Sequence, residues 1–536
     1  MTMQLRLLAI FYLAIAPMFL HAEQGAAVDL IVYGGTASGV VTAYSAAKQG
    51  LHVVLLEPSS HLGGMVTGGL SATDLGNYQI IGGYAREFYR RAAAHYGITN
   101  LDHPTNWLSE PHVGEAIFNE MLRETGVTIV FHRRIREHDG VSVVKKQLVA
   151  ITTDDGTAWH AKVFADCSYE GELMAQAAVH YTVGREGIAE YGETLAGVRP
   201  ETPAHQFTWA ISAYDARTAL YPEVDPGPLA PAGSGDKKVQ SYNFRLILTN
   251  DAKNRLPFPR PEGYDRSRFS LLTRYLAEFT QYRGHTPRVE DFFIPVQIPN
   301  HKADFNNNGP ISTDYIGHSW NYPDASFKEK DSLTQEHLLY TQSLVYFLSH
   351  DESVPETLRS KMNQWGLPRD EFEDTSHWPR QLYVREGRRM LGAYIIRQSD
   401  LQTARTKPDS IGMGSYNSDS HNVQRVAMPD GRVWNEGDVQ VPVRPYEIPY
   451  RVITPQRIDV ENLLVPVCLS ATHVAYSSVR MEPQYMIIGQ AAGDAAALAV
   501  HHHRAVQDIS ITELQRELKK EGAILHLKDE IAPQVP

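Results

Sequence analysis

The segment that decides the fold is residues 28–58, VDLIVYGGTASGVVTAYSAAKQGLHVVLLEP. It begins with a short apolar run, changes to the spacing of a helix, and returns to an apolar run within about thirty residues. We expect strands over 30–33 and 52–56, and a helix over 38–48 that ends at Gly50. Two strands joined through a helix form a βαβ unit, in which the strands are parallel.

A glycine-rich turn connects the first strand to the helix. Thr36 replaces the second glycine of the pattern G-x-G-x-x-G, while the first and third are present. In such a turn, backbone N–H groups and the positive end of the helix dipole face a diphosphate. The Thr36 side chain either displaces this diphosphate slightly or binds it through its hydroxyl. Glu57 ends the next strand, where a carboxylate accepts hydrogen bonds from ribose hydroxyls. The predicted dinucleotide site includes Gly34, Gly35, Thr36, Ala37, Ser38, Gly39 and Glu57.

The loop after this unit favours FAD over a nicotinamide cofactor. Residues 61–77, HLGGMVTGGLSATDLGN, contain five glycines, so backbone can approach a second extended part of the cofactor. Residues 461–499 predict a strand, a polar loop and a helix that opens near 481–484, with its positive dipole end toward the flavin ring. We therefore expect FAD to contact Pro58, His61, Gly63, Gly64, Met65, Gly68, Gly69, Glu482 and Gln484 as well.

Seven segments resemble those of a family of mostly exported bacterial FAD-dependent oxidoreductases, some of whose members are labelled xanthan lyases. The resemblance covers essentially all of 28–500. It implies an α/β fold with a Rossmann-type, glutathione-reductase-like FAD-binding domain, discontinuous in sequence, and an inserted α+β substrate domain. It adds Asp166 to the cofactor residues, but it implies no particular reaction. The segments are VYGGTASG, HLGGMVTGGLSATD, DCSYEGELMA, REGRRMLGAY, GMGSYNSDSH, PYEIPYR and SATHVAYSSVRMEPQYMIIGQAAG.

The 536 residues are enough for several structural units. A positive start, an apolar run and a cleavage position after Ala22 predict a signal peptide, with an uncleaved anchor as the alternative. We therefore expect a soluble protein in the periplasm or outside the cell. Parts of 380–425 are expected to line the flavin site. The expected units are a signal peptide over 1–22, a FAD-binding domain over 23–190 and 451–503, a substrate domain mainly over 191–450, and a helical tail over 504–536.

Further elements are expected within these units. The sequence predicts a hairpin over 141–160 and an apolar strand over 463–467. A long helix over 483–500 is expected to pack its small residues against the sheet. Ser510 is expected to cap a closing helix over 512–521.

Composition excludes several classes of partner. A net charge of −12 without a long basic run argues against nucleic acid. Two cysteines, Cys167 and Cys468, are too few for a zinc cluster, and we expect buried thiols, with one bridge as the alternative. The oxygen-rich stretch from Asp304 to Asp314 does not match a calcium loop, so we expect a turn there and no metal site.

The source of electrons follows from what the sequence lacks. No second strand is followed by G-x-G-x-x-G, so no separate NAD(P)H site is expected. We infer direct dehydrogenation, in which a base takes a hydroxyl or amine proton while hydride passes to flavin N5. The expected substrate is a hydroxylated small molecule, with carbohydrates as one candidate because 27 tyrosines and seven tryptophans are available for stacking. Oxygen and a quinone both remain as acceptors, and a redox-neutral lyase or isomerase acting on saccharides is the alternative function.

Two histidines are candidates for the base. His473 is the first choice because it lies in the predicted polar loop before the last long helix. His421 follows Asp419 by two residues, a spacing that puts the carboxylate on the same face of an extended segment. The alternative for His473 is that it only hydrogen-bonds the loop or the flavin. The alternative for His421 is a position in a surface turn.

Charged residues near these histidines have two interpretations each. Arg480 and Glu482 either bind substrate or pair with each other at the start of the helix. The arginines of VREGRRM either bind an anion or form ion pairs on a helix surface. His61 lies in a region similar to the flavin-linking histidine region of succinate dehydrogenase flavoproteins, with a spacing that differs by one residue. Noncovalent FAD is nevertheless favoured over a covalent bond through His61.

Overall fold

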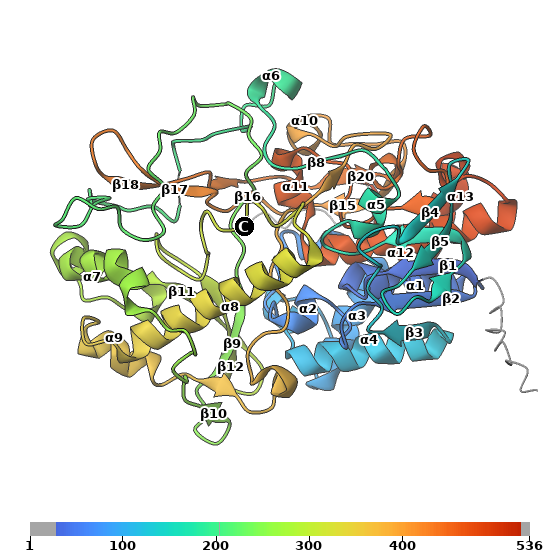
Figure 1. The fold of residues 1–536 in the computed structure, drawn as a ribbon. Coiled ribbons are helices and arrows are strands. Elements are labelled where there is room, and N and C mark those ends of the chain that lie inside the picture. The colour runs from blue at the N-terminus through green and yellow to red at the C-terminus, as the bar shows by residue number, and fades with distance from the viewer. Residues whose placement is uncertain (1–27, 203, 527–536) are drawn as a thin grey trace, which may run out of the picture.

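The computed structural model describes residues 28–202 and 204–526 (Figure 1). The predicted signal peptide, 1–22, lies outside these residues. Within the described part of the chain, no helix has both the length and the apolar character needed to cross a bilayer.

A five-stranded parallel sheet forms the centre of the first lobe of the molecule. Its strand order is β21-β7-β1-β2-β3, and every neighbouring pair is parallel. In chain order this is 3-2-1-4-5, the order of Rossmann-type sheets. The expected mixed α/β fold with a parallel sheet is therefore confirmed, although the last strand is shorter than the predicted 463–467. The strands are β1 (Val28–Tyr33), β2 (Val53–Glu57), β3 (Thr128–Phe131), β7 (Ala161–Asp166) and β21 (Leu463–Leu464).

Alternate residues of β1 belong to two different cores. Leu30 and Val32 belong to the same apolar core as four helices, whereas Ile31 and Tyr33 belong to a core shared with a three-stranded antiparallel sheet. The parallel sheet therefore lies between a helical layer and a small sheet, and the hairpin predicted over 141–160 has a third strand. The helices are α1 (Ala37–Lys48), α3 (Gly83–His95), α4 (Pro111–Thr125) and α12 (Glu482–His502), and the strands are β4 (Val141–Val144), β5 (Gln147–Thr152) and β6 (Ala158–Trp159).

Helices α1 and α12 pack closely because α12 presents glycines to α1. A Cβ atom on Gly489 would lie 2.5 Å from the Ser38 carbonyl oxygen, and one on Gly493 would lie 2.5 Å from that of Thr42. The small face of α12 therefore meets α1, and not the sheet as the sequence suggested. This contact holds the two chain ends of the first lobe together.

A second lobe has its own apolar core, rich in aromatic side chains such as Trp209, Tyr275 and Phe279. Strand β12 covers the first part of the stretch for which a turn was expected, so that expectation is wrong for 304–307. The domain boundaries given above stay a prediction. The elements of the second lobe are α7 (Ser270–Arg283), α8 (Phe327–His350), α9 (Glu356–Met362), β9 (Leu246–Thr249), β11 (Phe293–Ile298) and β12 (Lys302–Asn307).

Short elements complete the fold. Ser510 caps α13 (Ile511–Lys520) by accepting a hydrogen bond from the backbone N–H of Glu513, as expected. Both cysteines are free and buried, which confirms the expectation of thiols. Other short elements are α2 (Met65–Gly68), α5 (Glu172–Gln176), α11 (His473–Val479), β15 (Ser410–Gly414), β16 (Ser418–Ser420), β19 (Val439–Val441) and β20 (Tyr446–Pro449).

Candidate functional site

The glycine turn is held tightly against the start of α1. A Cβ atom on Gly39 would lie 1.9 Å from the Gly34 carbonyl oxygen, so the turn requires glycine there. Thr36 is the N-cap of α1: its hydroxyl accepts a hydrogen bond from the Gly39 N–H (3.2 Å) and donates one to the Cys167 carbonyl (2.8 Å). The Thr36 hydroxyl therefore already has both a donor and an acceptor within the protein.

Glu57 lies beside this turn at the end of β2. Its carboxylate accepts hydrogen bonds from the N–H groups of Gly35 and Ser59, both at 2.6 Å. Burial raises the pKa of Glu57 in spite of these bonds. The side chain is thus placed where the sequence predicted a carboxylate, at the carboxyl end of the sheet next to the turn.

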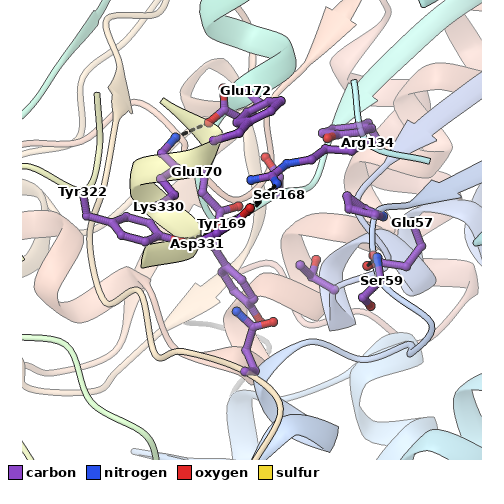
Figure 2. Close-up of a pocket in the computed structure, with 16 residues that line it drawn as sticks. Glu57, Ser59, Arg134, Ser168, Tyr169, Glu170, Glu172, Tyr322, Lys330 and Asp331 are labelled. Carbon is purple, nitrogen blue, oxygen red and sulfur yellow. Dashed lines mark hydrogen bonds and ion pairs between the residues drawn. The ribbon is translucent and has the colours of Figure 1, made fainter. Parts of the chain in front are cut away.

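Two cavities flank the turn and Glu57. The larger has a volume of about 300 Å³ and the smaller about 80 Å³. Both are lined by Thr36, Glu57, Ser59 and Gln381, so they lie next to each other. Figure 2 shows side chains that line the larger cavity, with Glu57 and Ser59 on one side and Lys330 and Asp331 of α8 on the other. Of the predicted contacts, Gly34 and Pro58 line the larger cavity, and His61, Gly64 and Gly68 line the smaller.

Two predicted cofactor residues are fully engaged with the protein. The imidazole of His61 lies 2.9 Å from Glu115 through Nδ1 and 2.7 Å from Asp374 through Nε2. Asp166 accepts hydrogen bonds from the N–H and hydroxyl of Ser168, at 3.1 and 2.7 Å, and burial raises its pKa to about 6. Asp166 therefore shapes the loop that lines the larger cavity.

Buried polar atoms without partners gather at the opening of α12. Tyr169 accepts a hydrogen bond from the Met65 N–H (2.9 Å) and donates one to Glu482 Oε1 (2.8 Å). Glu482 Oε2 and both amide atoms of Gln484 are buried, and among the described residues they have no hydrogen-bond partner. Burial raises the pKa of Glu482 to about 8, so its side chain is neutral at pH 7. Since buried polar groups are nearly always satisfied, these atoms fit a bound group with both donors and acceptors, as a flavin ring has.

The loops around this opening bring together a cluster of charged and phenolic side chains, which are buried except for the half-buried Asp74 and Tyr416. Arg480 donates hydrogen bonds to the Tyr383 hydroxyl (2.9 Å) and the Asp419 carbonyl (2.8 Å), and Tyr416 donates one to Asp74 (2.8 Å). Arg480 and Glu482 thus hold different partners, and the alternative in which they pair with each other is wrong. We call the following residues the polar cluster: Asp74, Asp314, Tyr383, Arg385, Tyr416, Asp419, His421 and Arg480.

His421 lies in this cluster between two carboxylates. Its Nδ1 is 2.7 Å from Asp314, and its Nε2 is 3.7 Å from Asp419. Burial and Arg385 lower the pKa of His421, but Asp314 and Asp419 outweigh them and raise it. His421 is 7% exposed, so the alternative of a surface turn is wrong. Asp419 was predicted from its spacing to His421, whereas Asp314, the closer carboxylate, was expected only as part of a turn.

His473 occupies a more enclosed position. It is the first residue of α11, so the predicted polar loop is partly helical. Its Nδ1 lies 2.7 Å from Glu386 and its Nε2 lies 3.2 Å from the Ser420 hydroxyl. Burial alone would raise the pKa of Glu386, but His473 and Arg389 outweigh it and bring it to about 2. Both ring nitrogens of His473 therefore have protein partners.

The arginines of VREGRRM are buried and do not lie on a helix surface as one interpretation supposed. Arg385 pairs with Asp314 (2.9 Å), Arg388 with Asp324 (3.0 Å) and Arg389 with Glu186 (2.8 Å). Sequence reasoning also missed the roles of other polar-cluster residues. The only signal for them was their position in segments that carry the family resemblance, which contain Asp74, Arg385 and Tyr416.

The chain is similar to several proteins of known structure over less than a third of its length. No curated protein matches the chain. Among solved structures, a flavin-containing monooxygenase from Stenotrophomonas maltophilia is 18% identical over 31% of this chain and 43% of that chain, with a TM-score of 0.19. A THI4 protein from Thermovibrio ammonificans is 16% identical over 30% of this chain and 66% of that chain, with a TM-score of 0.23. An L-amino acid deaminase from Proteus vulgaris is 15% identical over 30% of this chain and 61% of that chain, with a TM-score of 0.21.

The chain thus spans less than two thirds of the length of each of these structures. The assignment comes from a family match over residues 29–518, to the family described as "FAD dependent oxidoreductase". The match includes the glycine turn, both cavities, the polar cluster and α12. The chain therefore belongs to this family of oxidoreductases, whose cofactor is FAD.

Proposed function

We propose that the protein is an exported enzyme that dehydrogenates a hydroxylated small molecule, with carbohydrates as one candidate, and passes the electrons to FAD without NAD(P)H. Oxygen or a quinone then reoxidises the cofactor. The polar cluster is the proposed substrate site. The observation that carries the proposal is the buried His421 and Asp314 pair beside Arg480 and Tyr383, next to the loops expected to hold the flavin.

FAD is proposed to lie along the two cavities and to reach the opening of α12. The turn from Gly34 to Gly39 would hold the diphosphate, and Glu57 would accept hydrogen bonds from the ribose. The polar edge of the flavin ring would hydrogen-bond to Glu482 Oε2 and to the amide of Gln484, which lack partners among the described residues. Because both nitrogens of His61 contact carboxylates, we propose that the cofactor is held without a covalent bond.

The polar cluster adjoins this proposed path. A Cβ atom on Gly76 would lie 2.6 Å from the Ser415 hydroxyl, next to Tyr416, and Asp74 of the same loop accepts a hydrogen bond from Tyr416 (2.8 Å). Arg480 lies two residues before Glu482 in the chain. A substrate in the cluster would therefore be close to the ring edge.

His421 is the proposed base, in place of His473. When bound, FAD supplies an acceptor for the hydride that leaves the substrate carbon. His421 would take the hydroxyl proton through Nε2, while Asp314 fixes the ring through Nδ1 and stabilises the charge that forms. His473 is proposed to position β16, which carries Asp419, through its contact with Ser420.

The charge balance of the site favours a neutral substrate. Arg245 pairs with Asp304 (2.8 Å) and Arg385 with Asp314 (2.9 Å), while Arg480 lies 3.6 Å from Asp419. Each of these three arginines thus already has a carboxylate, and none of the three is left over for a substrate carboxylate. We expect neutral polyols or sugars to be better substrates than the corresponding sugar acids.

Anaerobic mixing tests this proposal. The purified holoenzyme is mixed with a panel of neutral sugars, polyols and sugar acids, and its visible flavin absorbance is recorded. Bleaching by a neutral hydroxylated compound, without NADH or NADPH, is the expected result. Turnover of a saccharide with an unchanged flavin spectrum would instead identify a redox-neutral lyase or isomerase, and reduction by NADH or NADPH alone would contradict the direct route.

A further inference from the structure

The larger cavity is formed by both lobes of the molecule. On one side are β1, β2 and the loop after β7, and on the other are Phe327, Lys330 and Asp331, which belong to the first two turns of α8 (Figure 2). Helix α8, yellow in Figure 1, reaches this cavity from the second lobe. A ligand beneath these turns would be covered by an element that does not belong to the nucleotide-binding sheet.

Several contacts hold α8 over the cavity. Arg134, which follows β3, donates hydrogen bonds to both carboxylate oxygens of Asp331 at 3.2 Å. Its guanidinium group also lies 3.9 Å from the centre of the Phe327 ring, within the range of a cation–π contact. The Phe327 N–H donates a hydrogen bond to Glu137 (2.7 Å), and Lys330 pairs with Glu172. Arg134 is thus the residue through which the first lobe binds Phe327 and Asp331 together.

The charges of the cavity indicate which part of FAD it accepts. Its lining contains the carboxylates of Glu57, Glu170, Glu172 and Asp331, but only two cationic side chains, Arg134 and Lys330. Both cations are already paired with carboxylates. A phosphate group there would be repelled, whereas the neutral adenine and ribose would not. The diphosphate belongs instead at the opening of α1, where N–H groups face it.

We propose that the adenosine end of FAD binds in this cavity beneath α8, and that Arg134, Phe327 and Asp331 form a clasp that slows release of the cofactor. The clasp is distinct from the turn and Glu57, because it comes from the opposite lobe. Release of FAD requires α8 to lift, which breaks the ion pair and the cation–π contact together. Each of these contacts is modest alone, so their joint loss is expected to accelerate release about tenfold.

The experiment measures cofactor release and does not depend on turnover. Holoenzyme is diluted, samples are passed through a desalting column at intervals, and retained FAD is measured by its visible absorbance. Arg134→Ala is compared with Arg133→Ala, whose arginine makes a similar exposed ion pair, with Asp155 at 3.2 Å, but does not line the cavity. Release about tenfold faster in Arg134→Ala only, with unchanged thermal unfolding of the apoprotein, is the expected result.

Two further measurements keep the proposal testable if Arg134→Ala folds poorly. Asp331 is 67% exposed, so Asp331→Asn is expected to fold and to release FAD severalfold faster. ADP, which has the adenosine but no flavin ring, is expected to bind the wild-type apoprotein and to bind Asp331→Asn more weakly. Equal release rates in wild type, Arg134→Ala and Asp331→Asn, or equal ADP affinity, would overturn the clasp. A protein that holds FAD but oxidises no substrate would contradict the proposed function. The clasp would still be tested by the rates of FAD release and by ADP binding, because neither measurement needs turnover.

Discussion

Glu482→Gln tests the claim that the acid at the opening of α12 is neutral in the apoprotein. The side chain is buried and its Oε2 has no partner among the described residues, and burial raises its pKa from 4.5 to about 8. The folded chain binds the proton of Glu482 more tightly than the unfolded chain, so protonation of Glu482 stabilises the fold. This contribution to the free energy of unfolding is complete below about pH 4.5 and is lost as the pH rises through about 8. At about 1.4 kcal/mol per pKa unit, the loss from this group is about 5 kcal/mol. Glutamine keeps the shape of the acid and cannot ionise, so this loss is expected to disappear.

Urea unfolding of the apoprotein measures the effect. At about pH 6 the variant should be more stable than wild type by about 2 kcal/mol, and at about pH 9 by about 5 kcal/mol. Glu120→Gln is the control, because Glu120 lies on α4 with 54% of its side chain exposed. An infrared difference spectrum of wild type against Glu482→Gln should also show a protonated carboxyl band that titrates near pH 8. A band that titrates near the ordinary value, together with parallel stability curves, would refute the reasoning.

Three further changes test the site and the packing. His421→Ala should keep FAD bound but slow the anaerobic reduction of FAD by substrate about a hundredfold or more, as measured by stopped-flow absorbance. The control is His350→Ala, on the surface of α8, which should leave the rate of reduction unchanged. Asp314→Asn should move the acidic limb of the profile of kcat/KM against pH to lower pH. The reason is that Asp314 raises the pKa of His421, which acts as a base only when it is neutral. An acidic limb that does not move would remove His421 from the mechanism. Gly493→Ala should lower the free energy of unfolding by about 1–3 kcal/mol, since its Cβ would lie 2.5 Å from a carbonyl oxygen of α1. Gly114→Ala, whose Cβ would meet no atom closer than 3.5 Å, is the matched control, and equal losses would contradict the packing argument.

The part of the fold that the sequence predicted well is local. Strand β1, helix α1 and strand β2 were expected within one or two residues of their observed bounds, because apolar periodicity and Gly50 mark each element within a few positions. The same is true of α13, whose cap residues, Ser510 and Glu513, are only three positions apart in the chain. The short strand β21 was overestimated because an apolar run does not show where its pairing ends.

The candidate site was predicted only where it is local. Glu57 was placed correctly because it ends a strand next to the turn. The pairing of His421 with Asp314 joins residues 107 positions apart, and no pattern in a single sequence shows that such segments meet. Arg385 was a candidate for an ion pair on a helix surface because its neighbours in the sequence are charged. In the structure it is buried, and the carboxylate of Asp314, from a distant segment, compensates its charge.

The location of FAD is tested most directly by a crystal structure of the yellow holoprotein. We expect density for adenosine beneath α8, for ribose at Glu57, for the diphosphate at the opening of α1, and for the ring beside Glu482 and Gln484, with His421 facing it across the substrate site. Density for FAD elsewhere, or a ring separated from the polar cluster by protein, would contradict the proposed site and the role of His421.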